Sequence, residues 1–187
     1  MTPRDASASA CLPATDVVCE SARLVMRRVR GDDAAFIFAL LNDPDWIRYI
    51  GDKNIRTHDD ARRYIDATLI AMTARNGFGL DVVVRKADGV PIGLCGLIKR
   101  DALEDVDVGF AFLPAFRGEG YAREAAAAAL AYGASAFGLR RVAAITSTGN
   151  ARSIHLLESL GFTFQSVIEL WPGDPGTNLY LRDIAAA

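Results

Sequence analysis

A strand, a glycine-containing turn and an alanine-rich segment follow one another between Val106 and Gly138, and this stretch constrains the fold most. Apolar residues occupy every second position from Val106 to Phe112, which is the period of a strand. The chain then passes through Arg117–Gly120 into a segment with the highest helix propensity in the sequence. This order leaves several backbone N–H groups without partners at the positive end of the helix dipole. The stretch therefore predicts an anion site, and we expect a phosphate group there.

Two common phosphate-binding motifs do not match this turn. A P-loop has a lysine directly after its last glycine, and no lysine follows Gly120. A dinucleotide fingerprint requires a small residue three positions after that glycine, where this chain has Arg123. A simpler interpretation also stays open, namely a helix start whose small residues allow close packing.

Length, charge and cysteine content limit the class of protein. The 187 residues, 51% hydrophobic and 24% charged, are typical of one globular domain with a sizeable core. The net charge of -2 gives no reason to expect nucleic-acid binding, and no apolar run approaches the ~20 residues of a membrane span. An odd number of cysteines without metal-site spacing, only two histidines and no signal-peptide pattern predict a cytoplasmic protein without a bound metal.

The remaining patterns predict a single domain over residues 21–187, preceded by a flexible tail over residues 1–20. The tail is rich in Ala, Ser, Thr and Pro and shows no period. Alternation, capping residues and Gly or Pro breaks predict the order β-α-α-β-β-β-α-β-α-β-β, an α/β (α+β) fold on one mixed sheet. Besides the alanine-rich helix, the expected helices cover Ala34–Leu41, Thr57–Ala74 and Ala151–Leu160, and the expected strands cover Arg23–Val29, Phe78–Arg85, Val90–Lys99, Val106–Leu113, Arg140–Ser147, Phe164–Leu170 and Thr177–Arg182.

The connection Trp46–Arg56 has an apolar content that is unusual for a loop, and it includes Trp46, Tyr49 and Ile50. Two interpretations are open. These side chains fill the core, or they line a groove for a substrate. The turn Pro172–Gly176 is another segment that we expect to border such a groove.

Two motifs resemble those of one family. The turn and helix start Arg117–Ala122 resembles the pyrophosphate loop, Arg/Gln-x-x-Gly-x-Gly/Ala, of the GCN5-related N-acetyltransferases (GNAT), which bind acetyl-CoA. The segment Asn150–Phe162 is similar to that family's Asn-x-x-Ala/Ser…Leu-Gly-Phe signature and lies at the expected distance. Finer motifs are similar to the branch of ribosomal-protein alanine acetyltransferases; they are Arg23-Leu24…Arg27, Ile92-Gly93…Gly96 and Val108-Gly109-Phe110. The resemblance covers nearly everything after residue 20.

The resemblance implies a fold in which two parallel central strands, one ending near Leu113 and the next over Arg140–Ser147, splay apart at the acetyl-CoA site. Backbone groups on the first strand would bind the pantetheine arm, and N–H groups of the turn would hold the pyrophosphate. The side chains of Arg117 and Arg123 would add positive charge, unless they are solvated surface arginines. Asn150 would reach the pantetheine amides, unless it only caps a helix. The implied donor-binding residues are Phe112, Leu113, Arg117, Gly118, Gly120, Tyr121, Ala122, Arg123, Asn150 and Ser153.

The implied reaction is transfer of an acetyl group from acetyl-CoA to a primary amine by direct attack on the thioester. An ammonium group must first lose a proton, which a carboxylate can accept. We expect Asp107 to be this base, because it faces away from Val108 and stands where many family members carry Glu; Glu104 and Asp105 are alternatives. Many relatives place a Tyr where this chain has Leu157, so Ser153 or a water molecule would assist the departing thiolate.

The sequence leaves the acceptor open. A protein N-terminus, such as that of a ribosomal protein, and a small amine such as an antibiotic or a polyamine are both consistent with the branch. A non-catalytic module that senses acyl-CoA is the alternative outside the enzymes. We expect a monomer or a homodimer.

Overall fold

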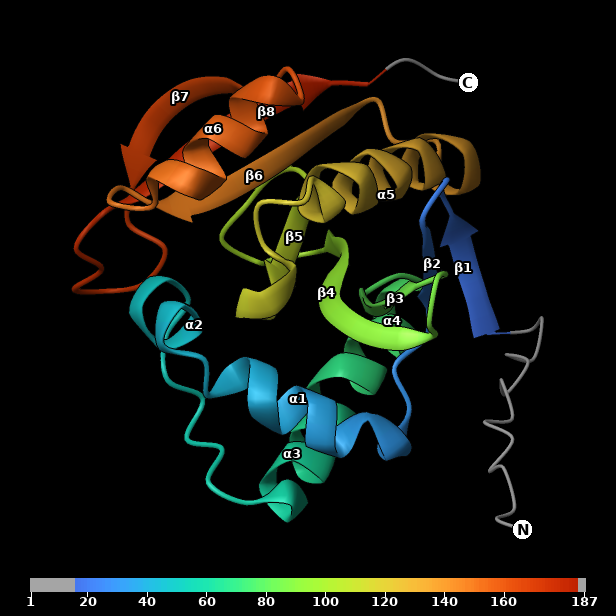
Figure 1. Cartoon of the computed structure of the whole chain (residues 1–187). Coiled ribbons are helices and arrows are strands. Elements are labelled where there is room, and N and C mark those ends of the chain that lie inside the picture. Colours follow the sequence, from blue (N-terminus) through green and yellow to red (C-terminus); the bar gives the residue numbers. More distant parts are fainter. Residues whose placement is uncertain (1–15, 185–187) are drawn as a thin grey trace, which may run out of the picture.

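A mixed sheet forms the centre of the protein. The computed structural model describes residues 16–184, and within this range eight strands form one sheet in the order β1-β2-β3-β4-β5-β6-β8-β7. Neighbouring strands are antiparallel except β5 and β6, which are parallel. The helices α5 and α6 cover one face and α1 and α3 cover the other (Figure 1). The predicted single-domain fold is confirmed.

The bounds of most elements agree with the sequence patterns. The strands are β1 (Val17–Glu20), β2 (Leu24–Arg27), β3 (Leu80–Arg85), β4 (Val90–Ile98), β5 (Asp107–Phe112), β6 (Arg141–Ser147), β7 (Thr163–Ile168) and β8 (Thr177–Asp183). The helices are α1 (Ala34–Leu41), α2 (Pro44–Tyr49), α3 (His58–Tyr64), α4 (Ala71–Asn76), α5 (Tyr121–Phe137) and α6 (Ala151–Ser159), with a π-helical turn at Ile65–Ile70 and 3-10 turns at Gly31–Asp33 and Pro114–Phe116. None of the helices between residues 16 and 184 has the length and apolar character that a membrane crossing requires.

The N-terminal region differs from the prediction. Four residues that we assigned to a tail over residues 1–20 form β1, which pairs antiparallel with β2, Cys19 opposite Met26. A strand this short shows no readable period, and it forms because β2 offers it the unpaired backbone groups of a sheet edge. Residues 1–15 lie outside the described residues.

The connection after α1 also differs from the prediction, because it begins with a helix. Pro44 occupies the first turn of α2, and the Asp43 carboxylate caps the helix by accepting from the amides of Asp45 and Trp46 at 3.2 and 3.3 Å. Trp46 is 6% exposed and packs in the core, whereas Ile50 is 44% exposed. The core interpretation is therefore confirmed for Trp46 alone.

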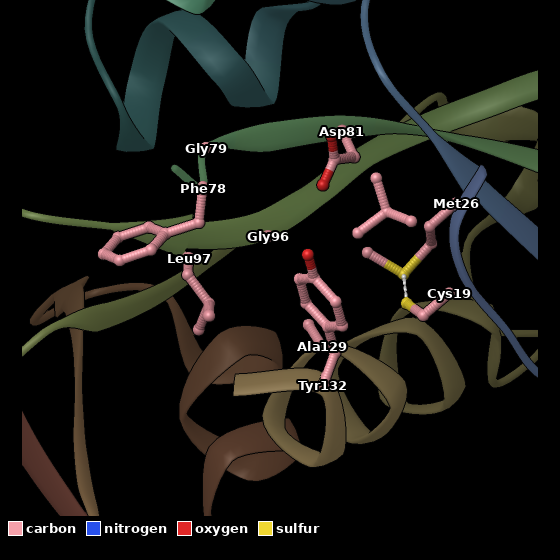
Figure 2. A pocket seen from close by; sticks show the side chains of 10 residues that line it. Cys19, Met26, Phe78, Gly79, Asp81, Gly96, Leu97, Ala129 and Tyr132 are labelled. Carbon is pink, nitrogen blue, oxygen red and sulfur yellow. Dashed lines mark hydrogen bonds between the residues drawn. The ribbon is translucent and has the colours of Figure 1, made fainter. Parts of the chain in front are cut away.

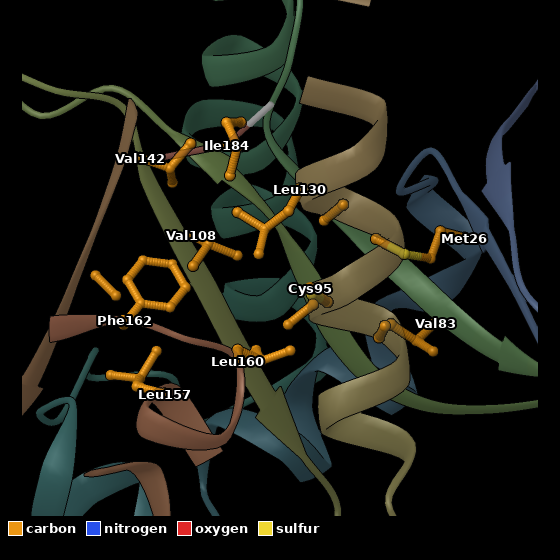
Figure 3. Packing of buried hydrophobic residues seen from close by; sticks show 14 of the residues in the cluster. Met26, Val83, Cys95, Val108, Leu130, Val142, Leu157, Leu160, Phe162 and Ile184 are labelled. Carbon is orange, nitrogen blue, oxygen red and sulfur yellow. The ribbon is translucent and has the colours of Figure 1, made fainter. Parts of the chain in front are cut away.

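Two apolar clusters lie on the two faces of the sheet. The first lies between α5, α6 and the sheet, and Figure 3 shows side chains from β2, β4, β5 and α6 gathered around α5. The buried positions of α5 are mostly alanines, so the helix lies close to the strands; they are Ala125, Ala126, Ala129, Leu130, Gly133 and Ala134. The second cluster lies under α1 and α3.

The central strands β5 and β6 separate after one paired position. Asp107 is in register with Ala143, whose amide donates to Val106 O at 2.9 Å, and no further pair follows among the described residues. The middle of β5, Gly109 to Ala111, is partly exposed although β5 is a central strand. The predicted splay is confirmed, and it opens from Asp107 toward Phe112.

Candidate functional site

The turn before α5 presents a row of free amides. Gly118 and Gly120 adopt left-handed backbone conformations, with φ of 83° and 78°, which L residues with a side chain rarely adopt. The first amide bonded into the helix is that of Glu124, which donates to Gly120 O at 3.1 Å. Within residues 16–184, the amides from Gly118 to Arg123 donate to no acceptor. Free amides at a helix start are what the predicted anion site requires, and we call the row from Gly118 to Arg123 the cradle.

Arg23 packs against this cradle, and the sequence interpretation gave it no role. Its Nε donates to Glu124 Oε2 at 2.7 Å and its Nη1 donates to Glu119 O at 3.1 Å. Its guanidinium lies over the ring of Tyr121, 4.4 Å from the centroid. A Cβ on Gly120 would lie 3.5 Å from Arg23 Nη2. The Arg-Leu-x-x-Arg motif was the available signal, but it does not show where its first arginine lies.

Arg117 does not provide free charge at the cradle, which corrects the prediction for its side chain. Its Nε donates to Phe112 O at 2.8 Å and its Nη1 donates to Asp45 Oδ2 at 2.8 Å, while its Nη2 contacts Asp43. Its amide is also occupied, by Pro114 O. Arg117 therefore holds the loop to α2, and Arg123, exposed in the first turn of α5, remains the predicted arginine of the cradle.

The backbone of β5 offers different groups from those predicted. The Leu113 amide donates to Ile92 O and its carbonyl accepts from the Phe116 amide, both at 3.0 Å, so both backbone groups of this expected donor-binding residue already have partners within the protein. Backbone groups of a strand point alternately to its two neighbours, so Phe110 and Phe112 point theirs toward β6. The Phe112 amide faces the splay, although its carbonyl accepts from Arg117. Phe110 is a residue that the sequence interpretation missed.

The start of α6 forms the opposite wall of the splay. The Asn150 side chain caps α6, because its Oδ1 accepts from the Ser153 amide at 3.2 Å. The capping interpretation is therefore confirmed, and the Asn150 Nδ2 and the Ser153 hydroxyl have no partner within residues 16–184. Leu157 is buried in the core. No tyrosine hydroxyl stands at that position to protonate a leaving group.

Asp107, the expected base, lies where the splay begins, but its carboxylate is not open to solvent. Its side chain is 1% exposed, and Arg100 Nε donates to its two oxygens at 3.0 and 3.2 Å. Burial raises the pKa of Asp107 to about 6, and the Arg100 guanidinium partly offsets this rise. The alternatives, Glu104 and Asp105, pair with Arg141 at the start of β6, at 3.6 and 2.8 Å. Asp107 is thus the buried acid at the narrow end.

These parts suit an acyl-coenzyme A donor. The free amides of the cradle suit a diphosphate, the free groups of β5 suit the amides of an extended arm, and the narrow end carries a titratable acid. Within residues 16–184, no cluster of three or more His, Cys, Asp or Glu side chains could hold a metal ion.

Comparisons with known proteins agree with this geometry. Residues 23–163 match the acetyltransferase (GNAT) domain family. The chain is 26% identical over 162 residues to the uncharacterized N-acetyltransferase YoaA of Bacillus subtilis (strain 168), a match that covers 86% of this chain and 90% of that protein.

Two solved structures illustrate the likeness in fold. The structure of RimL, a ribosomal L7/L12 alpha-N-protein acetyltransferase in complex with coenzyme A, matches with a TM-score of 0.78 and 16% identity over 92% of this chain and 100% of that one. A spermidine N-acetyltransferase from Vibrio cholerae, in complex with CoA and spermine, matches with a TM-score of 0.71 and 20% identity over 87% and 96%. The family match spans most of the chain, and the structure provides the splay and the cradle; the chain therefore belongs to the GNAT acetyltransferase family and is an acyltransferase that uses acetyl-CoA as its donor.

Proposed function

We propose that this enzyme transfers the acetyl group to the α-amino group at the N-terminus of a polypeptide, by direct attack of the amine on the thioester. The observation that carries the proposal is the single paired position, Asp107 with Ala143, between β5 and β6. It leaves a slot in the middle of the sheet that is open from Phe112 to its narrow end. A thioester held there lies beside a buried carboxylate.

The donor is held from both walls of the slot. The amides from Gly118 to Arg123 bind the pyrophosphate, and the backbone groups of Phe110 and Phe112 bind the pantetheine arm. Asn150 already uses its Oδ1 as a helix cap, so its Nδ2 is the group that donates to a pantetheine carbonyl. This arrangement uses one atom of Asn150 for the fold and one for the donor.

Asp107 is the proposed base, and an acceptor with a lower pKa transfers its proton to this base more easily. A peptide α-ammonium has an ordinary pKa of about 7.7–8.0 and an alkylammonium one of about 10.4. Because the pKa of Asp107 is about 6, proton transfer is uphill by about 2 pKa units from the first and more than 4 from the second. Arg100 covers the carboxylate, so a water molecule carries the proton to it.

The departing thiolate receives little help from the protein. Leu157 is part of the core, and the Ser153 hydroxyl is a weak acid. We propose that Ser153 orients the sulfur through a hydrogen bond and that solvent supplies the proton. A polyamine, which carries several positive charges, is disfavoured, because the Arg100 guanidinium already lies against the Asp107 carboxylate.

A thiol-release assay with acetyl-CoA tests the proposal. The panel contains short peptides with a free N-terminus and no lysine, the same peptides with a blocked N-terminus, a lysine-containing blocked peptide, and spermidine. Turnover of the free peptides, lost on blocking, supports the proposal. Turnover of spermidine or of the lysine peptide alone contradicts it, and donor binding without turnover of any acceptor points to the sensor alternative.

A further inference from the structure

Within the described residues, no strand pairing joins the two walls of the donor slot, β5 and β6, at their open end. Beyond Asp107 and Ala143, no residues of β5 and β6 are in register within the described part of the chain. The β5 wall continues into the turn that carries Arg117, and the β6 wall continues into α6, which carries Arg152. Both side chains therefore mark the mouth of the slot, one on each side.

One carboxylate joins these two arginines. Asp45 Oδ2 accepts from Arg117 Nη1 at 2.8 Å and from Arg152 Nη2 at 2.7 Å. Within residues 16–184, no other acidic side chain pairs with both. The side chains of Asp45 and Arg117 are 31% and 24% exposed, and that of Arg152 is 68% exposed. Water therefore screens the ion pair between Asp45 and Arg117 less than the one between Asp45 and Arg152.

The helix that carries Asp45 is itself anchored. Asp43 caps α2 and also contacts Arg117, and Trp46, the next residue after Asp45, is buried in the core under α1. Asp45 therefore stands on a short helix fixed at both its cap and its buried face. A carboxylate in this place holds the two walls at a set separation.

We propose that Asp45 is a positioning residue that sets the width of the donor slot at its mouth by bridging Arg117 and Arg152. The proposal rests on the donor lying between β5 and β6, as set out under the proposed function. Asp45 does not touch the reacting atoms. Its loss therefore weakens donor binding and leaves the acyl-transfer step itself nearly unchanged.

Four variants test the bridge, each measured by calorimetric titration with coenzyme A, by steady-state kinetics and by thermal unfolding. Asp45→Asn removes both ion pairs and should raise the coenzyme A Kd and the acetyl-CoA KM about 5- to 20-fold, with kcat within about twofold. Arg152→Gln removes only the exposed ion pair with Asp45 and should raise the coenzyme A Kd by a smaller factor. Asp45→Glu keeps the charge and should restore most of the affinity. Asp59→Asn, which removes an exposed ion pair to Arg62 on α3, is the matched control and should change nothing.

The outcomes separate the bridge from the proposed function. If the wild-type protein does not bind coenzyme A, the donor site is wrong. If it binds and folded Asp45→Asn binds equally well, the bridge is wrong while the donor site stands. A fall in kcat with unchanged donor KM also overturns the proposal, because it would place Asp45 on the acceptor side. If Asp45→Asn does not fold, Arg152→Gln decides, since an unchanged donor Kd in that variant contradicts a two-armed bridge.

Discussion

Asp107 on β5 faces Ala143 on β6 at the single position, within the described residues, where these parallel strands are in register. The carboxylate of Asp107 is buried at this point, and Arg100 Nε donates a hydrogen bond to its Oδ1 at 3.0 Å. The structure thus puts the titratable acid at the narrow end of the slot and the free amides of Gly118–Arg123 at the open end. A donor anchored by its diphosphate at the open end would extend its thioester toward the acid.

Replacing Gly120 by Asp should abolish donor binding. The new carboxylate would oppose the phosphates, and a residue with a side chain is strained at φ 78°. We expect the coenzyme A Kd, measured by calorimetric titration, to rise about 100-fold or more. Gly138→Asp is the matched control, because Gly138 has φ 64° at the other end of α5, about 25 Å away. Equal loss of affinity in both variants would mean that strain, not charge at the cradle, explains the effect.

Asp107→Asn should remove the acidic limb of the pH–rate profile. A base works only when ionised, so the wild-type kcat/KM should rise as the pH increases through about 6, the pKa of Asp107. The variant should be slower above this pH, by about 10²-fold or more, and its profile should lack the limb. Coenzyme A affinity is the control and should stay within about twofold.

Arg100→Gln should shift the acidic limb of the pH–rate profile that Asp107 causes, whereas Asp107→Asn should remove it. The Arg100 guanidinium lowers the pKa of Asp107, so its removal should raise that pKa and move the acidic limb to higher pH. An unchanged limb in both Arg100→Gln and Asp107→Asn would show that another group is the base.

Arg23→Met should weaken donor binding although Arg23 lies directly before β2, far from the cradle in sequence. Without the guanidinium, the Glu124 carboxylate keeps its hydrogen bonds from the Ser21 hydroxyl and the amide of residue 23, but its negative charge in the first turn of α5 is no longer neutralised, and Tyr121 loses its stacking partner. The coenzyme A Kd should rise about 3- to 10-fold, against no change for Arg62→Met on the exposed face of α3. If Arg23→Met and Arg62→Met bind coenzyme A with the same Kd, Arg23 has only a structural role.

Asp81 should make the protein less stable as the pH rises from about 4 to about 6. It is buried at a cavity of about 10 Å³, near the size of one water molecule, with Tyr132 pointing toward the cavity from α5 (Figure 2). Burial raises the pKa of Asp81 to about 6 despite the ion pair to Arg28, so between the ordinary pKa and 6 the native state binds more protons than the unfolded state.

The comparison with Asp81→Asn isolates this contribution. The variant does not titrate, so the free energy of unfolding of the wild type minus that of the variant should fall by about 2–3 kcal/mol across this window and level off above pH 6. Urea unfolding at several pH values measures it. A difference that does not vary with pH contradicts a raised pKa at Asp81.

The sequence predicts the fold and the cradle because both depend on local patterns. The alternation of apolar residues predicts β5, and the run of alanines predicts α5. Gly118 and Gly120 lie at the two positions of the turn where the backbone has a positive φ. The short strand β1 and the helix α2 have no such pattern, because a sheet edge and a single Asp43 cap decide them.

Side-chain partners were the part that could not be predicted. The ion pairs of Arg117 with Asp43 and Asp45, and that of Arg23 with Glu124, join segments that are distant in the sequence. A strand period places Asp107 on one face, but it does not reveal that Arg100 covers its carboxylate. Pairing across the fold, rather than residue type, thus decides which charges are free for a ligand.

The most direct test of the account is a crystal structure of the protein grown with acetyl-CoA. The account predicts pyrophosphate oxygens within about 3 Å of the amides between Gly118 and Arg123, with the pantetheine arm between β5 and β6 and the thioester pointing toward Asp107. A donor bound elsewhere on the protein, or bound here with its diphosphate away from these amides, would contradict it.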